Sequence, residues 1–109
     1  MRILVVSDLH YRLKQYDWLL RAVEGYDLLI IAGDLLDMAG FASIDAQIIV
    51  VLKYMRRLQD QIPLMVCSGN HDCDDKNQAG EFVATWLGKA RGERVWVDGQ
   101  SISLQGDLY

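Results

Sequence analysis

Carboxylate, amide and imidazole side chains recur in three short motifs, each of which follows an apolar run. The motifs are Ser7-Asp8-Leu9-His10, Gly33-Asp34-Leu35-Leu36-Asp37 and Gly69-Asn70-His71-Asp72. Oxygen and imidazole atoms are ligands that divalent metals accept, and a bound metal suits hydrolysis. The candidate ligands are therefore Asp8, His10, Asp34, Asp37, Asn70 and His71.

Each motif also has an ordinary structural interpretation. Asp8 and His10 are compatible with a capped turn and a solvated histidine, because isolated Asp-x-His triplets occur by chance. Asp34 can bridge two cations, but a carboxylate after a glycine is also common in turns. His71 is compatible with a metal ligand, with a general acid or transition-state hydrogen-bond donor, or with a surface residue of a turn. The chain has only two histidines and both lie in these motifs, which favours a function.

The elements that must position these motifs follow from hydrophobic periodicity. Aliphatic runs predict buried strands at about residues 3–7, 27–32 and 62–67, and each run ends at a motif. Three- and four-residue spacings predict helices at about residues 13–24, 44–59 and 78–89. Helical crossovers make the strands parallel, and ligands collect beyond the carboxyl ends of parallel strands. We therefore expect an α/β fold, a β-sheet with flanking helices, whose motifs converge at one edge.

The predicted helices have apolar faces that should cover this sheet. For the first two helices the faces are Leu13, Tyr16, Leu20 and Val23, and then Ile44, Ile48, Val51, Met55 and Leu58. For the third helix the face is Phe82, Val83, Trp86 and Leu87. Ser43 is placed to cap the second helix, and Gly25 to end the first in a left-handed conformation. Near the end of the chain, strands 94–97 and 100–104 are predicted to form a hairpin across Asp98-Gly99.

Composition limits the class of protein. The 109 residues are enough for one small domain, and a net charge of -4 argues against a basic nucleic-acid-binding face. The apolar run at the start is too short for a signal peptide, and no run reaches the length of a membrane span. Two cysteines in an apolar-rich chain indicate reduced thiols and a cytoplasmic location. A nucleotide-binding domain would need a glycine-rich turn after the first strand, and Ser7-Asp8-Leu9-His10 has none.

The three motifs together, in this order and each after a predicted strand, resemble those of the calcineurin-like metallophosphoesterase family. The family pattern is Asp-x-His, Gly-Asp-x-x-Asp and Gly-Asn-His-Asp/Glu, and all three blocks are present. The resemblance implies hydrolysis of a phosphomonoester or phosphodiester by water that two metal ions activate. It implies that Asp8 and His10 bind the first metal, that Asp34 bridges both, and that Asn70 binds the second. His71 would protonate the leaving group, Asp37 would orient its imidazole, and Asp72 would have a supporting role.

The family completes its site with histidines in later Gly-His and Gly-His-x-His segments, and this sequence has no histidine after His71. Residues 1–109 would therefore be the amino-terminal part of such a domain, the first half of its α/β sandwich. The expected cofactors are two divalent ions, with manganese, iron or zinc favoured by mixed oxygen and nitrogen ligands. The expected partners are a phosphoester substrate and either a second copy of the chain or a completing second half. The alternative is an incomplete metal-binding or scaffolding module with little or no catalysis.

Overall fold

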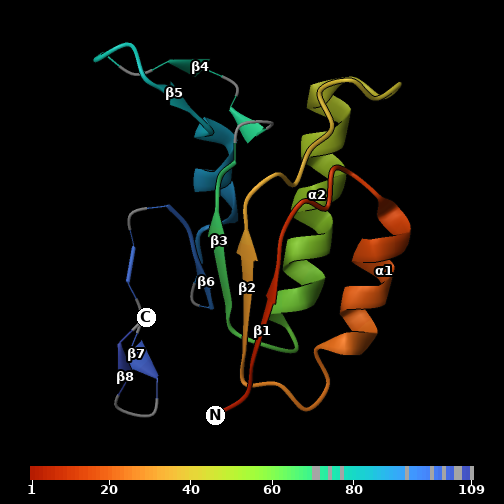
Figure 1. The fold of residues 1–109 in the computed structure, drawn as a ribbon, viewed down its shortest axis with the longest axis vertical. Helices are drawn as coiled ribbons and strands as arrows, with labels where there is room; N and C mark the ends of the chain where they lie inside the picture. The colour runs from red at the N-terminus through yellow and green to blue at the C-terminus, as the bar shows by residue number, and fades with distance from the viewer. Residues whose placement is uncertain are drawn as a thin grey trace.

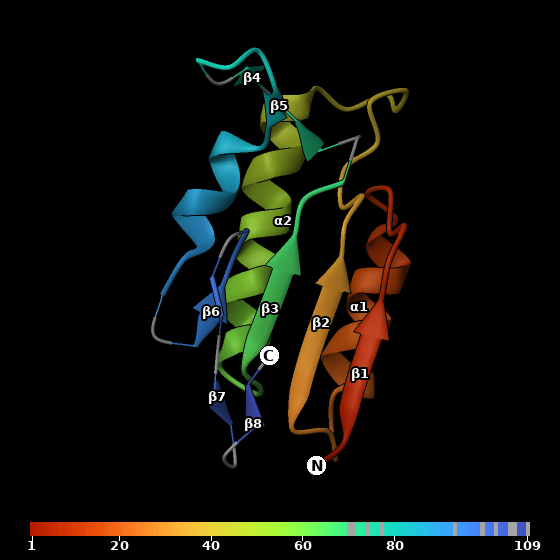
Figure 2. The same ribbon diagram turned by 60° about the vertical axis from the view of Figure 1, so that its left-hand side comes forward.

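A parallel β-sheet with helices against one face forms the body of the molecule (Figures 1 and 2). The structure is a computed structural model, and it describes residues 1–69, 72–73, 75–76, 78–92, 94–98, 100–101, 103–104 and 107–108. The sheet has the order β1-β2-β3-β6, with β1 at Ile3–Val6, β2 at Leu28–Ala32, β3 at Leu64–Cys67 and β6 at Val95–Trp96. All three pairings are parallel, which confirms the predicted α/β fold with flanking helices.

Alternation along the strands sends one set of side chains toward the helices. In register across the sheet, Leu29 pairs with Leu64 and Ile31 with Val66, and all four are buried. They pack in one core cluster with residues of both helices. Each side chain of this size contributes about 1.5–3 kcal/mol when fully buried, so this layer holds the helices on the sheet.

Helix α1 spans Leu13–Ala22 and its core face differs from the prediction at two positions. Tyr16 and Val23 are buried, as expected, but Leu13 is 38% exposed because it is the first residue of the helix. Leu19, which was not in the predicted stripe, is fully buried instead. The left-handed conformation expected at Gly25 is present, with a φ of 83°.

Helix α2 spans Ile44–Gln59, the predicted range. Its predicted cap is confirmed, because the Ala46 N–H donates to Ser43 Oγ at 3.2 Å. The predicted stripe faces the core: the buried members are Val51, Met55 and Leu58, with Ile44 and Ile48 partly buried beside them. One buried residue of this helix is polar, Gln47, and it fixes the loop that precedes the helix.

The predicted third helix is wrong over most of its length. Gly80 has a φ of 80°, outside the right-handed helical region, and Phe82–Val83 is a strand, β5, paired antiparallel with β4 at Asp75–Lys76. Only Thr85–Ala90 is helical, as the short 3-10 helix η2. Its buried residues are Trp86 and Leu87, which were in the predicted face, and it packs beside α2.

Of the predicted hairpin across Asp98-Gly99, the described residues show the closing bond, from the Gln100 N–H to Val97 O at 3.0 Å, but not the pairing of its two strands. The first of its two strands, β6, pairs with β3 of the main sheet instead. Farther along, β7 at Ser103–Leu104 pairs with β8 at Asp107–Leu108. Asp98 has another contact, since its Oδ1 accepts the Ser68 N–H at 2.8 Å, while Gly99 lies outside the described residues. Among the helices that the structure describes, none has the length and apolar character needed to cross a membrane.

Candidate metal centre

The loops after β1 and β2 run side by side beyond the carboxyl end of the sheet. Three backbone hydrogen bonds join them: Asp8 N–H to Gly33 O at 3.2 Å, His10 N–H to Asp34 O at 2.9 Å, and Tyr11 N–H to Leu35 O at 2.8 Å. The pairing of the strands thus continues into the loops. It brings the first two sequence motifs together, as the position of both motifs at the carboxyl ends of parallel strands led us to expect.

The backbone of these loops is unusual. Asp8, His10, Tyr11 and Asp34 have φ values of 57°, 44°, 57° and 56°, all in the left-handed region. Such residues outside glycine cost about 1–3 kcal/mol each, and they cluster at ligand sites. Asp tolerates this region better than most residues. Four neighbouring instances therefore point to a functional constraint on where these side chains are aimed.

Asp8, His10 and Asp34 each offer a ligand atom, and these atoms lie within 4.8 Å of one another. We call these three residues the metal group. Asp8 and His10 have side-chain exposures of 65% and 28%, so the group is open to solvent on one side. Ser7 Oγ donates to Asp8 Oδ2 at 3.1 Å, which helps to fix that carboxylate.

The imidazole of His10 is oriented by contacts at both ring nitrogens. Nδ1 lies 3.4 Å from Leu36 O, and Nε2 lies 3.5 Å from Asp8 Oδ1. With the proton on Nδ1, that nitrogen donates to the carbonyl, and the Nε2 lone pair is directed toward the carboxylate. A cation between Nε2 and Asp8 Oδ1 would relieve the repulsion between these two acceptors. A carbonyl partner on the far nitrogen is also typical of metal-binding histidine.

The metal group fits a divalent ion by distance as well as by chemistry. Bonds of about 2.0–2.2 Å place two ligands on opposite sides of an ion at most about 4.4 Å apart. Ligand atoms within 4.8 Å need to move by only a few tenths of an ångström to meet that limit. Two carboxylates and one imidazole suit manganese, iron or zinc. The three residues therefore fit one ion and leave coordination positions for further ligands.

Gly69, in the loop after β3, lies very close to Asp34 of this group. A Cβ built on Gly69 would lie 2.5 Å from Asp34 N and closer still to Asp34 Oδ1. On the other side of the contact, a Cβ on Gly33 would lie 3.1 Å from Gly69 Cα. The loops after β2 and β3 thus meet backbone to backbone. This contact is the reason for a glycine at the start of the third motif.

Asp72 is completely buried and ties the same two loops together. Its Oδ1 accepts the N–H groups of Leu35 and Leu36 at 2.8 and 2.9 Å, and its Oδ2 accepts the Gly69 N–H at 2.8 Å. Burial raises the pKa of Asp72 above its usual value, and its bonds to backbone N–H groups partly offset this rise. The carbonyl oxygen of Asp72 accepts the indole N–H of Trp86 at 2.8 Å. One carboxylate therefore sets the spacing of the loops after β2 and β3.

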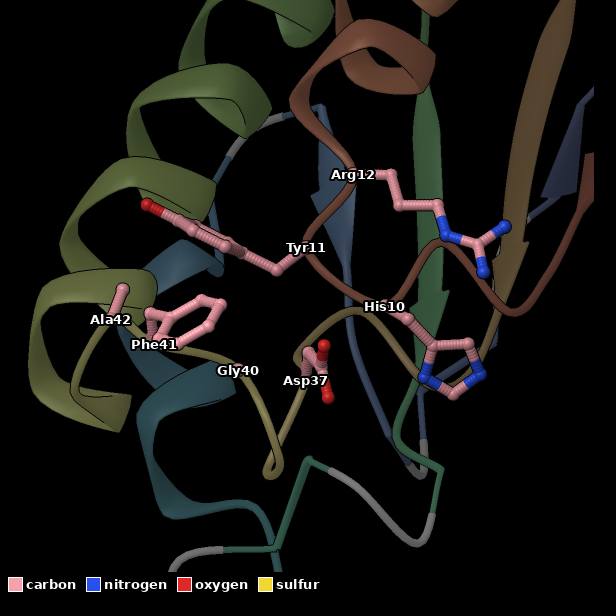
Figure 3. A pocket seen from close by; sticks show the side chains of 7 residues that line it. All are labelled: His10, Tyr11, Arg12, Asp37, Gly40, Phe41 and Ala42. Carbon is pink, nitrogen blue, oxygen red and sulfur yellow. The ribbon is translucent and has the colours of Figure 1, made fainter.

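Asp37 lies outside the metal group and lines a neighbouring cavity of about 690 Å³ (Figure 3). His10 belongs to both, since it also lines this cavity. Asp37 Oδ1 accepts the Ala39 N–H at 3.0 Å, as in many turns. The sequence predicts that six candidate ligands converge, and the structure describes four of them. Asp8, His10 and Asp34 come together, and Asp37 does not. Asn70 and His71 lie outside the described residues.

Sequence reasoning missed two residues that hold the site in place. Gln47 is buried in α2 and bonds to both ends of the loop that contains Asp37. Asp72 joins the loops after β2 and β3, whereas its motif implies only a supporting role. A signal for Asp72 was present, because it closes the third motif. Gln47 had no signal beyond being a polar residue in line with buried positions of its helix.

Two comparisons with known proteins bear on this arrangement. No curated protein matches the chain. The family model described as calcineurin-like phosphoesterase matches residues 1–105. That match covers nearly the whole chain, including the three motif loops, so the chain belongs to the calcineurin-like phosphoesterase family.

Proposed function

We propose that this chain carries metal-binding residues of a phosphoesterase that hydrolyses a phosphomonoester or phosphodiester. The observation that supports this proposal most is the metal group, three ligand atoms within 4.8 Å at the carboxyl end of the sheet, in a member of this family. When bound, two divalent ions would lower the pKa of a water molecule and offset charge on the phosphoryl oxygens. Manganese, iron and zinc all suit the ligand types.

The chain's own residues would have the following roles. Asp8 and His10 would hold the first ion, Asp34 would be a ligand of both ions, and Asn70 would hold the second. His71 donates a proton to the leaving-group oxygen, a role in which general acids contribute about 10²–10⁴-fold to rate. Asp37 orients the His71 imidazole. For Asn70 and His71 these roles rest on the sequence motif and on family membership.

The Asp34 carboxylate gives the sharpest test. We expect wild-type protein to bind Mn²⁺ and Asp34→Asn to bind it at least about tenfold more weakly, because loss of even an outer-shell partner of a metal ligand costs about 10–100-fold. Titration followed by the electron paramagnetic resonance of free Mn²⁺ measures this difference. Glu24→Gln is the matched control, since it removes the same charge from an exposed residue in the turn after α1. Equal affinities in all three proteins would contradict the proposal.

Turnover separates the enzyme from the alternative, a metal-binding or scaffolding module. That alternative is favoured by the two-histidine content of the chain. Hydrolysis of bis(4-nitrophenyl) phosphate or 4-nitrophenyl phosphate with added Mn²⁺ that is abolished in His71→Ala supports the enzyme. Mn²⁺ binding that depends on Asp34, without turnover in the wild-type protein, supports the module.

We propose further that the sheet face opposite the helices associates with a second copy of the chain or with a completing second half. Among the described strands β1 is an edge, and its Val5, which faces away from the helices, is 59% exposed. Exposed edges and apolar faces favour association. We expect sedimentation velocity to show self-association, lost in Val5→Glu and retained in Ile49→Glu, a residue with a similar exposure of 57% on α2. A stable monomer of the wild-type chain would contradict self-association through this face.

We also propose that the thiols of both cysteines are reduced. Cys67 and Cys73 form no disulfide with each other. Burial raises the pKa of the Cys67 thiol, with Asp98 adding to the rise. A raised pKa keeps this thiol protonated and unreactive. Because the chain has only two cysteines and a large share of apolar residues, we propose that it acts in the cytoplasm, where thiols stay reduced.

A further inference from the structure

The cavity beside the metal group has aromatic side chains on one side and polar ones on the other. In Figure 3 the rings of Tyr11 and Phe41 lie toward α2, and His10 and Arg12 lie across the cavity from them. Asp37 lies between the two sides. The cavity has a volume of about 690 Å³, which is typical of a small-molecule site. We call this cavity the aromatic pocket.

The loop that carries Phe41 is held in place from within the protein. Gln47 is fully buried, and its Nε2 donates to Asp37 O at 2.8 Å and to Ala42 O at 3.0 Å. Its Oε1 accepts the Asp37 N–H at 2.8 Å. One side chain therefore fixes both ends of residues 37–42. A turn inside the loop, with Gly40 N–H donating to Asp37 O at 3.2 Å, fixes its middle.

Phe41 has no packing role that would explain this support. Its relative exposure is 112%, the highest of the large apolar residues described as exposed, and the adjacent loop residue Met38 is 58% exposed. Leaving a phenylalanine side chain in water forgoes the benefit of burying it, which is large for a ring of this size. The loop is fixed by hydrogen bonds and exposes an aromatic ring beside the metal group. This arrangement is suited to binding a ligand.

We propose that the aromatic pocket binds an aromatic group carried by the phosphoester substrate, with the ring packed against Phe41 and Tyr11. This rests on the proposed function, because His10 joins the pocket to the metal group where the phosphoryl group would lie. Aromatic rings gain from stacked or edge-to-face contact with one another beyond the area they bury. The polar side, with Arg12 and Asp37, favours a ring with polar edges over a long aliphatic chain, which would meet charged groups there.

Three phosphonates test the pocket without hydrolysis: phenylphosphonate, cyclohexylphosphonate and methylphosphonate. We expect the phenyl compound to bind the wild-type chain about three- to tenfold more tightly than the methyl compound, with the cyclohexyl compound between them. Phe41→Ala should bring the three affinities together, and Phe41→Leu should remove only the preference for phenyl over cyclohexyl. Met38→Ala is the matched control, an exposed apolar residue of the same loop that does not line the pocket.

Nuclear magnetic resonance in metal-free and Zn²⁺-loaded protein provides a readout that is independent of activity. Nuclear Overhauser effects from phenylphosphonate to the rings of Tyr11 and Phe41 support the pocket, even if no metal binds and the proposed function fails. Zn²⁺ binding with equal affinities for the three phosphonates and no ring contact overturns the pocket and leaves the proposed function intact. Absence of both ring contact and metal binding overturns both.

Discussion

Replacing Asp72 with alanine is expected to lower the free energy of unfolding by about 3–5 kcal/mol, because it leaves three N–H donors without their acceptor. The donors are those of Leu35, Leu36 and Gly69, at 2.8, 2.9 and 2.8 Å. A buried donor left unsatisfied costs about 1–3 kcal/mol, and water entering the new space would recover part of that. Urea unfolding monitored by circular dichroism measures the loss.

Two further substitutions separate the hydrogen bonds from other effects of Asp72→Ala. Asp98→Ala removes an exposed carboxylate that accepts one backbone N–H, from Ser68 at 2.8 Å, and we expect a loss of only about 1 kcal/mol. Asp72→Asn keeps an acceptor for Leu35 and Leu36 but turns an amide donor toward the Gly69 N–H, so its stability should lie between those of wild type and Asp72→Ala. If Asp72→Ala and Asp98→Ala lost the same free energy of unfolding, Asp72 would not hold the two loops together.

The hydrogen bonds of Asp72 to both loops also explain why its loss should disturb the positions of the metal group. Leu35 follows Asp34 directly, and the Tyr11 N–H bonds to Leu35 O at 2.8 Å. The same carbonyl accepts the hydroxyl of Tyr16 at 2.9 Å. Burial, followed by the nearby Asp72 and Tyr11, raises the pKa of Tyr16, so its hydroxyl stays protonated and donates. Movement of the loop after β2 would therefore also displace the loop after β1.

The strands and the first two helices could be predicted because their sequence patterns agree with their tertiary environment. In α2 the buried residues recur with helical spacing, and a serine cap and a polar C-terminal turn mark its ends. In β1, β2 and β3 short aliphatic runs end at glycine or polar residues. Local preference and burial favour the same structure in these segments, which makes such predictions reliable.

The region after the third motif could not be predicted in the same way. Its apolar spacing matched a helix, but the structure bends at Gly80, where φ is 80°, and pairs Phe82–Val83 with a strand. Trp86 then anchors the chain through its bond to Asp72 O. The apolar spacing of this region matches a helix, whereas the observed structure depends on a short antiparallel pairing and on the bond from Trp86 to Asp72, which that spacing does not encode.

The candidate site, like the fold, could be predicted from the sequence only in part. Motif order at strand ends was enough to expect Asp8, His10 and Asp34 together, and their ligand atoms do lie within 4.8 Å. What holds them there was only partly visible in sequence: Asp72 closes the third motif, but the backbone groups that Asp72 and Gln47 bind can belong to any residue type. Asp37 was expected with the ligands, but it lines the neighbouring pocket. The assignment of metal binding and catalysis to these residues stays a prediction.

Gly69→Ala is expected to be the most damaging glycine-to-alanine change at the glycines that the structure describes. The φ of Gly69 is outside the left-handed region, so the backbone itself accepts alanine. The obstacle is space: the new Cβ would lie 2.5 Å from Asp34 N and 2.7 Å from Asp34 Cγ. Contacts below 3.0 Å with backbone cannot be tolerated, so the loop after β3 or the Asp34 side chain must move.

We expect Gly69→Ala to lower stability by about 3 kcal/mol, as overpacking against backbone does. It should also weaken Mn²⁺ binding at least about tenfold, because a displaced Asp34 carboxylate no longer meets Asp8 and His10 around one ion. Gly88→Ala is the matched control: its Cβ would meet nothing within 4 Å, so we expect unchanged metal affinity and a stability equal to wild type or up to about 1 kcal/mol higher. Urea unfolding and Mn²⁺ titration check both effects. If Gly69→Ala behaved like Gly88→Ala, Asp34 would not be held by the close approach of the two loops, and the metal group would lack the rigid support that its proposed chemistry requires.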